Sequence, residues 1–414
     1  MNKPELLLPA GSLERLKTAF LYGADAVYCG LPSVSLRAKS CFTTSDLKEG
    51  IDFAHQLGKK VYLTLNLFTH NGDLERLTEA VKMLHLLRPD GVIVADPGVF
   101  SFVGKMCPGL PRHISTQANV CSSLTVDFWK QQGATLCVLG REVPLKEMRA
   151  IRHDCPDIKL EVFVHGAMCI SYSGRCLLSN FMTGRSANKG NCAHSCRWKY
   201  KVYLEEEKRP GELMLWEEDE HGSYVMNSRD LCLMSRLDEL MDVGLDSFKI
   251  EGRNKSEYYV AVAARAYRHA IDDYFSDPEN WKPNTYLAEL ATLQNRGYTL
   301  GFFDGNAGPD SLNYELSAST GDWRYAGQIR GKTDDAVIFE VKHKINKGDV
   351  LTFLPPGQFE PIQYQVDTFY DAERGVSLET ISCGHLGQAI RLPMSQEMLE
   401  RLPVLSVARK CIKE

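Results

Sequence analysis

Short apolar runs alternate with longer amphipathic stretches along the first 255 residues. Eight runs, rich in β-branched residues, are expected to be strands: residues 5–10, 26–30, 60–66, 91–96, 112–119, 136–140, 159–165 and 247–251. Between them, apolar positions recur every three to four residues, which predicts helices at 12–22, 45–57, 73–87, 124–132, 145–153 and 231–241. Eight buried strands alternating with helices predict an α/β fold, a (β/α)8 TIM-like barrel.

The pattern changes after the barrel. Residues 255–274 and 284–295 have helical spacing, and residues 294–305 are expected to form a Gly-rich turn. From about residue 323 the period falls to two, in runs that begin at residues 325, 336, 349, 363 and 375. These runs predict a small all-β, barrel-like module. The expected domains are therefore a catalytic barrel at 1–310 and a C-terminal β-barrel domain at 320–414.

The link between the seventh and eighth predicted strands is far longer than an ordinary loop. It contains a cysteine-rich insertion at about 166–230 and a predicted hairpin of residues 198–203 and 224–227 around an acidic turn at 205–222. A long insertion at the catalytic face of a barrel is usually functional.

Polar residues lie at or just after the carboxyl ends of the predicted strands, where active sites of such barrels lie. They are Tyr28, Asn66, Asp96, Ser115, Gln117, Asn119, Arg141, Glu142, His165, Glu251 and Arg253. Any one of them could simply cap the next helix, but the whole ring predicts a lined pocket. His165 is either a general acid or base, or a buried histidine with its hydrogen bonds satisfied beneath the insertion.

Composition excludes some classes of protein. The 44% hydrophobic and 24% charged content, without an apolar run of about 18 residues, argues against a membrane protein. The apolar run at residues 6–8 is too short for a secretory signal. Thirteen cysteines without such a signal predict a reducing compartment, the cytoplasm. The net charge of -5 gives no global signal for nucleic acid, although a local basic face could still bind it.

Four cysteines lie within 28 residues: Cys169, Cys176, Cys192 and Cys196. Thiolates bind either structural zinc or iron-sulfur clusters. Zinc usually takes two close cysteine pairs, and only Cys192 and Cys196 have that spacing. The wider gap from Cys169 to Cys176 favours a [4Fe-4S] cluster.

Two further thiols bear on the ligand set. Cys232 stands at the start of a predicted helix, where the dipole stabilises a thiolate, and Cys41 is another possibility. We expect Cys169, Cys176, Cys192 and Cys232 to be the ligands, with Cys196 as the alternative fourth. The other cysteines are expected to be buried free thiols: Cys29, Cys107, Cys121, Cys137, Cys155, Cys383 and Cys411.

The run EVFVHGAMCISYSGRCLLS at residues 161–179 resembles the U32 peptidase-like (collagenase-like) family, as do LLLPAGS, NSRDLC and FKIEGRNKSEYYVA. Within it, NKGNCAHSCRWKY and NRGYTLGFF are similar to the branch that hydroxylates tRNA. The resemblance implies hydroxylation of the wobble uridine at position 34 to 5-hydroxyuridine, with a [4Fe-4S] cluster and prephenate as co-substrate. Related branches modify a cytidine of 23S rRNA or act in ubiquinone synthesis. Cys41 departs from the family pattern, since many relatives have Asn there.

On this interpretation the expected catalytic residues are His165, Gln117, Asn119, Glu251 and Arg253, and the expected substrate-binding residues are Arg37, Asn66, Arg141, Arg197 and Trp198. The tRNA anticodon stem-loop would meet a basic run with aromatic neighbours: Arg185, Lys189, Arg197, Trp198, Lys199, Tyr200 and Lys201. The alternative is that this run is a solvated face beside an anionic cluster.

Three other functions compete. The family name suggests a protease, but the chain has neither a His-Glu-x-x-His helix nor a Gly-x-Ser-x-Gly elbow. A barrel with structural zinc could bind RNA or protein without catalysis. A hydroxylase could also act on another RNA or on a small aromatic substrate.

Overall fold

The computed structural model describes residues 2–31, 42–168, 176, 178–185, 192–198, 202–204, 210–211, 214–216, 228–305, 321–382 and 388–413. The chain divides into two compact units. The first comprises Met1–Leu13, Ala26–Asn254 and Asn295–Thr320, and the second comprises Glu14–Asp25, Lys255–Gln294 and Gly321–Glu414. This division assigns residues 14–25 and 255–294 to the unit of the β module, whereas the predicted boundaries, 1–310 and 320–414, follow the chain and stay a prediction.

Eight parallel strands form a closed barrel in the first unit, as predicted. They are β1 (Glu5–Pro9), β2 (Ala26–Gly30), β3 (Lys60–Leu65), β4 (Gly91–Val94), β5 (Arg112–Ile114), β6 (Leu136–Val138), β7 (Lys159–Ala167) and β11 (Ser247–Ile250). Each pairs with the next, and β11 pairs with both β7 and β1 to close the ring. The strand predicted at 112–119 is shorter than expected, because the chain turns at Ser115 into the 3-10 helix η2 (Thr116–Ala118).

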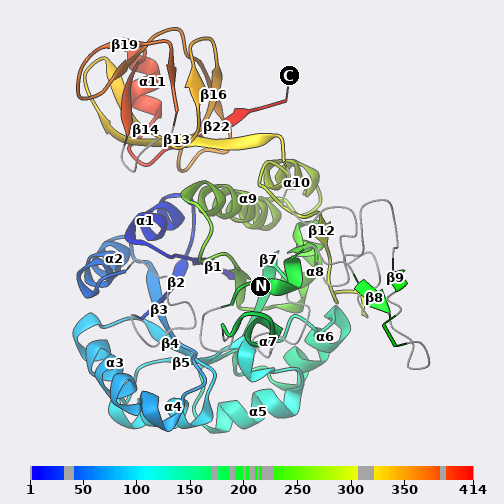
Figure 1. Cartoon of the computed structure of the whole chain (residues 1–414). Coiled ribbons are helices and arrows are strands. Elements are labelled where there is room, and N and C mark those ends of the chain that lie inside the picture. Colours follow the sequence, from blue (N-terminus) through cyan, green and yellow to red (C-terminus); the bar gives the residue numbers. More distant parts are fainter. Residues whose placement is uncertain are drawn as a thin grey trace. The chain divides into compact units, whose positions relative to one another are not determined.

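Helices surround these strands (Figure 1). In this unit they are α2 (Thr44–Gln56), α3 (Leu74–Leu87), α4 (Pro97–Met106), α5 (Ser123–Gln131), α6 (Leu145–Asp154) and α8 (Leu237–Val243). A capping box of Thr43 and Asp46 starts α2. The helix α4 is absent from the predicted set, because its two glycines and two valines are poor helix formers. None of the helices in the described part of the chain has the length and apolarity that crossing a bilayer requires.

The strand β7 changes partner along its length. Its first residues pair in parallel with β11, and its last residues pair antiparallel with β10 (Asp230–Cys232), which in turn pairs with β12 (Tyr298–Thr299). Gly166 lies at this change, with φ of +113°, and a Cβ there would approach the backbone oxygen of Glu251 to 2.5 Å. Two predictions are corrected: residues 231–241 start as a strand before η5 (Met234–Arg236) and α8, and the turn at 294–305 contains β12.

The described part of the insertion contains α7 (Leu178–Thr183), the 3-10 helix η4 (Ser195–Arg197) and an antiparallel hairpin of β8 (Val202–Leu204) and β9 (Met214–Trp216). The hairpin is predicted, but its second strand is misplaced. The apolar residues Met214, Leu215 and Trp216 form β9 inside the stretch expected to be an acidic turn. The expected strand at 224–227 lies outside the described residues.

Polar side chains occupy the interior of the barrel below the strand ends. Lys249 and Glu161 form an ion pair (2.7 Å), and Ser247 donates a hydrogen bond to the same carboxylate (2.8 Å). Glu161 is 1% exposed and Lys249 is 4% exposed. Because both charges are out of water, each depends on the other for compensation.

The second unit contains α1 (Leu13–Leu21), α9 (Glu257–Ser276), α10 (Asn284–Leu290), α11 (Gln396–Arg401) and the predicted all-β module. Its eight-stranded antiparallel sheet consists of β13 (Trp323–Lys332), β14 (Ala336–Val341), β16 (Val350–Leu354), β17 (Ile362–Gln365), β18 (Phe369–Asp371), β19 (Ser377–Leu378), β21 (Ala389–Pro393) and β22 (Val407–Cys411). A separate pair is formed by β15 (Ile345–Asn346) and β20 (Thr380–Ile381). The core includes Phe339, Phe353 and Phe369.

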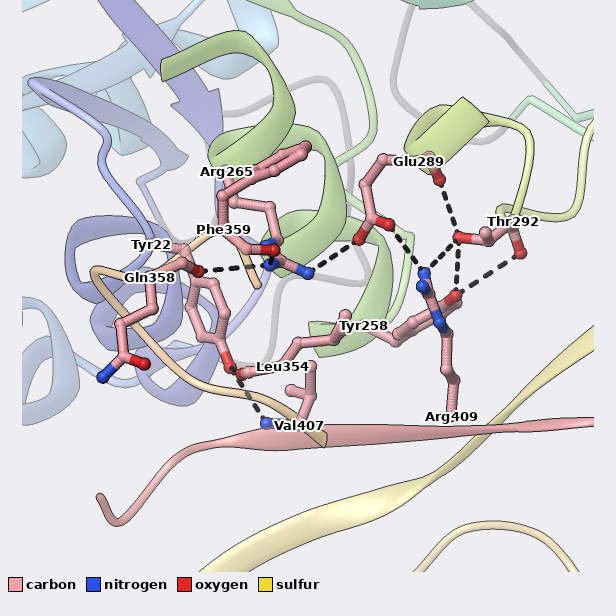
Figure 2. A network of polar contacts seen from close by, with 10 residues as sticks. All are labelled: Tyr22, Tyr258, Arg265, Glu289, Thr292, Leu354, Gln358, Phe359, Val407 and Arg409. Carbon is pink, nitrogen blue, oxygen red and sulfur yellow. Dashed lines mark hydrogen bonds and ion pairs between the residues drawn. The ribbon is translucent and has the colours of Figure 1, made fainter. Parts of the chain in front are cut away.

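A buried polar network joins the helices of this unit to its sheet (Figure 2). The hydroxyl of Tyr22, the residue after α1, donates to the Leu354 carbonyl and accepts from the Val407 amide (2.9 Å). The two carboxylate oxygens of Glu289 on α10 bind different guanidinium groups, Arg265 of α9 (2.8 Å) and Arg409 of β22 (3.0 Å). Glu289 therefore compensates two buried cations from separate elements.

Replacing Glu289 with Gln would leave both guanidinium groups without this carboxylate. We expect the unfolding free energy of the second unit to fall by about 3–5 kcal/mol, as when a partner of a buried ion pair is removed. Urea unfolding measures the change. Glu397→Gln is the matched control, since Glu397 pairs with Arg401 at 3.9 Å on the surface and should cost about 0.5 kcal/mol or less. Equal losses in the two variants would contradict the assigned role.

The barrel ion pair gives a second prediction. Lys249→Met leaves the Glu161 carboxylate buried without its cation, so the unfolding free energy should fall by about 3–5 kcal/mol. The double variant Glu161→Gln, Lys249→Met carries no unpaired charge and should recover part of that loss. A double variant no more stable than Lys249→Met in the same urea titration would show that the loss is not electrostatic.

Candidate active site at the carboxyl ends of the barrel strands

Glu251 and Arg253, which follow β11, meet side chains of β2 and β3. The Tyr28 hydroxyl donates to the Glu251 carboxylate (2.9 Å), and Arg253 donates to the Thr64 hydroxyl (2.9 Å). The guanidinium of Arg253 lies 5.8 Å from the centre of the Tyr28 ring. The structure thus brings these two predicted residues together, with a carboxylate and a guanidinium on either side of one phenol ring.

His165 is buried at the end of β7. Its ring lies 5.4 Å from that of Tyr298, and its backbone oxygen accepts a hydrogen bond from the Glu251 amide (2.9 Å). This backbone contact places it beside Glu251. The acid or base role of the imidazole stays a prediction.

Four buried polar atoms near the strand ends have no hydrogen-bond partner within the described structure. They are Asn66 Oδ1, Gln117 Nε2, Asn119 Oδ1 and Glu142 Oε2. A buried polar atom without a partner costs about 1–3 kcal/mol, so native proteins keep few of them. Their concentration after β3, β5 and β6 indicates a place where a ligand supplies the missing bonds.

The remaining residues of the predicted ring have structural roles. Asp96 caps α4 by accepting from the Val99 amide, and Ser115 caps η2. For these two, the interpretation as helix caps is confirmed. The Arg141 guanidinium lies 4.0 Å from the centre of the Phe163 ring.

Sequence reasoning missed a layer of charged residues in the barrel, below the carboxyl ends of the strands. The Lys249 ammonium, paired with Glu161, lies 4.6 Å from the centre of the Tyr28 ring and so supports the phenol that binds Glu251. Burial, together with Lys249 and two other lysines, lowers the pKa of His113 to about 3, which keeps this imidazole neutral. The sequence did contain a signal for this layer, because Lys249 is a charged residue inside an otherwise apolar strand.

Three of the predicted cluster cysteines flank one packed segment. Cys176 precedes α7, Cys192 precedes η4, and Cys196 is within η4. The Ser179 hydroxyl on α7 accepts from the Ala193 amide (2.9 Å) and so holds the two parts together. The Cys192 sulfur accepts a hydrogen bond from the His194 amide (3.4 Å).

Cys232 lies in β10, where its Cα pairs with that of His165. The prediction that a helix dipole stabilises this thiolate is wrong, because the residues around Cys232 extend the sheet instead. The pairing nevertheless puts Cys232 opposite a residue only four positions before Cys169. Cys169 and Cys41 lie outside the described residues, within which no metal-binding group of three or more His, Cys, Asp or Glu side chains occurs.

The other cysteines are mostly buried thiols, as expected. Burial raises the pKa of Cys29 and that of Cys137 to about 12, so both stay protonated. Cys107 and Cys155 are also buried and Cys121 is partly buried. The expectation is wrong for Cys411, which is exposed near the end of β22. Cys383 is outside the described residues.

Exposed aromatic side chains accompany the cysteines. Trp198 is 45% exposed after η4, and Phe181 on α7, which sequence reasoning did not select, is 85% exposed. Arg185 donates to the Cys192 carbonyl (3.5 Å), and the backbone of Arg197 ends η4. The other predicted basic and aromatic positions, Arg37, Lys189, Lys199, Tyr200 and Lys201, lie outside the described residues.

Comparisons with known proteins identify the family of this chain. The profile of Peptidase family U32 matches residues 11–313. "tRNA hydroxylation protein P" of Escherichia coli (strain K12) is 40% identical over 398 residues, which cover 86% of this chain and 87% of that protein. "23S rRNA 5-hydroxycytidine C2501 synthase" of the same organism is 36% identical over 271 residues, 66% of this chain and 40% of that protein. A solved structure described as a U32 peptidase is 17% identical, with a TM-score of 0.40, and covers 61% of this chain and 94% of its own. The chain therefore belongs to peptidase family U32, in the branch of the tRNA hydroxylation proteins.

Proposed function

We propose that this protein hydroxylates uridine at wobble position 34 of tRNA to 5-hydroxyuridine. The observation that carries the proposal is 40% identity to a tRNA hydroxylation protein along 86% of the chain. Chemistry on a base requires the base to leave the stack and enter a pocket. The buried polar atoms at the strand ends are suited to receive it, since they lack partners within the described residues.

The proposed catalytic residues are His165, Gln117, Asn119, Glu251 and Arg253. His165 lies near the end of β7, and the others follow β5 and β11 at the same end of the barrel. The two carboxamides offer hydrogen bonds to a base, while Glu251 and Arg253 are held by Tyr28 and Thr64. Their fixed positions suit binding and orientation of substrate and co-substrate.

We further propose a [4Fe-4S] cluster on Cys169, Cys176, Cys192 and Cys232. The donor set fits, because thiolates are the usual ligands of such clusters. Support comes from the hydrogen bond between Ser179 on α7 and Ala193, which holds together the segments that follow Cys176 and Cys192, and from the backbone pairing of Cys232 with His165, four positions before Cys169. Cys196 is the alternative fourth ligand. The cluster would supply electron transfer or Lewis acidity at the mouth of the barrel.

Prephenate is the proposed co-substrate. It is a dicarboxylate, and guanidinium groups bind carboxylates in a bidentate manner. Arg253 and Arg141 lie at two strand ends, each near an aromatic ring that limits its movement. Arg37, which is also among the predicted substrate-binding residues, lies outside the described residues.

The proposed RNA contact is the anticodon stem-loop. Exposed Trp198 and Phe181 offer faces on which unpaired bases stack, and Arg185 and Arg197 offer charges for phosphates. Asn66 belongs to the proposed base-binding set, because its buried Oδ1 lacks a partner among the described residues.

Two other functions remain to be weighed. Identity of 36% to a 23S rRNA hydroxycytidine synthase favours a second candidate, hydroxylation of another RNA. For a thiol protease, the chain does contain a cysteine-histidine contact, between Cys107 Sγ and His85 Nε2 at 3.5 Å. However, Cys107 follows α4 and burial raises its pKa, which is the opposite of an activated nucleophile.

The first test is nucleoside mass spectrometry of tRNA from cells that lack the gene. We expect the wild-type gene to restore 5-hydroxyuridine, and Cys176→Ala to restore less than about a tenth of it, because a cluster ligand is lost. Cys411→Ala, which removes an exposed thiol far from the cluster cysteines in sequence, is the control and should behave like the wild type. Wobble uridines that stay unmodified with the wild-type gene would refute the proposed function.

A second test addresses RNA binding. Loss of one base-stacking aromatic costs about 1–3 kcal/mol, so Trp198→Ala should raise the Kd for the anticodon stem-loop roughly 5- to 150-fold. Phe128→Ala removes a similarly exposed aromatic from α5 and should leave the Kd unchanged. Fluorescence anisotropy with a labelled stem-loop makes the comparison, and equal effects of the two variants would argue against the proposed RNA face.

A further inference from the structure

The turn after β5 presents a small, ordered set of polar side chains. The Ser115 amide donates to the Val94 carbonyl (2.8 Å), which anchors the turn to the barrel. The Ser115 hydroxyl oxygen accepts from the Gln117 amide (3.3 Å), and the same hydroxyl donates to Gln117 Oε1 (3.5 Å). Ser115 and Gln117 are each only 4% exposed.

These contacts orient the Gln117 carboxamide. The oxygen of the Ser115 hydroxyl already accepts from a backbone amide, so its hydrogen needs an acceptor, which Oε1 provides. Turning the carboxamide over would leave that hydrogen without an acceptor in the described structure. The atom of Gln117 that remains without a partner is therefore Nε2, which is a hydrogen-bond donor.

An acceptor follows two residues later. Asn119 ends the 3-10 turn in the left-handed region, with φ of 53°, where its amide donates to the Thr116 carbonyl (3.0 Å). Its Oδ1 is buried and without a hydrogen-bond partner among the described residues. The turn therefore offers one unused donor and one unused acceptor, in that order.

We propose that Gln117 and Asn119 select the target pyrimidine by its hydrogen-bonding edge. This inference rests on the function proposed above. Uracil carries an acceptor, O4, beside a donor, N3–H, so Gln117 Nε2 would donate to O4 and Asn119 Oδ1 would accept from N3–H. Cytosine carries the reverse order, an amino group beside an unprotonated N3, and would meet donor with donor and acceptor with acceptor.

Such a mismatch strongly disfavours the binding of cytosine. A site built around hydrogen bonds to a substrate rejects an analogue that leaves its buried polar groups unpaired. Ser115 contributes as a positioning residue, because it orients the donor without touching the base. The distinction matters within this family, where a relative carries the name of a 5-hydroxycytidine synthase.

The test measures 5-hydroxyuridine and 5-hydroxycytidine at position 34 in cells that lack the gene and carry a variant. Gln117→Glu replaces the donor with a carboxylate that only accepts. We expect 5-hydroxyuridine to fall about tenfold or more, and 5-hydroxycytidine to appear in tRNAs with a wobble cytidine. Gln132→Glu makes the same chemical change on the exposed end of α5 and should alter neither nucleoside.

Further variants separate specificity from folding. Gln117→Met keeps the volume without a charge and should lower the ratio of hydroxylated uridine to hydroxylated cytidine by about tenfold, at unchanged protein level and melting temperature. Ser115→Ala releases the carboxamide and should lower the same ratio, whereas Ser115→Thr keeps the hydroxyl and should preserve it.

The outcomes are distinct. A uridine-to-cytidine ratio that stays at the wild-type value in Gln117→Glu and in Gln117→Met overturns this inference and leaves the proposed function intact. A loss of 5-hydroxyuridine in both variants without any gain of 5-hydroxycytidine overturns it as well, because it indicates a structural role. A wild-type gene that restores no 5-hydroxyuridine refutes the proposed function and this inference with it.

Discussion

Closure of the barrel between β7 and β11 is the constraint on which the first unit depends. Because all eight strands run in the same direction, closure puts their carboxyl ends on one rim, whatever their distance in sequence. Glu251 thereby reaches Tyr28, more than 220 positions away. Within the barrel β7 pairs with both β6 and β11, and its last residues, beyond the pairing with β6, pair with β10.

The interior of the barrel, below the carboxyl ends of the strands, is also ordered by specific contacts. An apolar interior would be simpler to bury, yet Lys249 and Glu161 lie there as a compensated pair. The pair has a steric and electrostatic consequence at the rim, since the ammonium lies against the ring of Tyr28, whose hydroxyl binds Glu251. Buried charges of this kind favour one arrangement of the interior over others, because any shift would separate them.

The sequence was sufficient to predict the eight barrel strands, but not all the segments that pair with them. Apolar runs with β-branched residues marked all eight barrel strands, because continuous burial imposes that pattern. The pattern could not reveal β10, whose three residues continue directly into a helical stretch and were assigned to it. It also assigned α9 and α10 to the predicted domain 1–310 by chain order, and that boundary stays a prediction. The contacts of Arg265 and Glu289 lie within the unit that contains the β module.

The residues of the candidate site also divide into those that the sequence could predict and those that it could not. Position after a strand was enough to select Gln117, Asn119 and Glu251, since strand direction alone decides which end is the rim. The partners Thr64 and Lys249 were not selected, because nothing in a single sequence says which side chains face one another across a closed sheet. The ligand set of the cysteines depends on residues such as Cys169 that lie outside the described structure.

The hydrogen bond between Tyr22 and Val407 spans 385 positions of the chain. A ribosome adds roughly 5 to 20 residues per second, so roughly 20 to 80 seconds separate the synthesis of these two partners. During that interval α1 has been made, but the strand that completes its unit has not. Tyr22 therefore waits for its hydrogen-bond donor until translation is nearly finished.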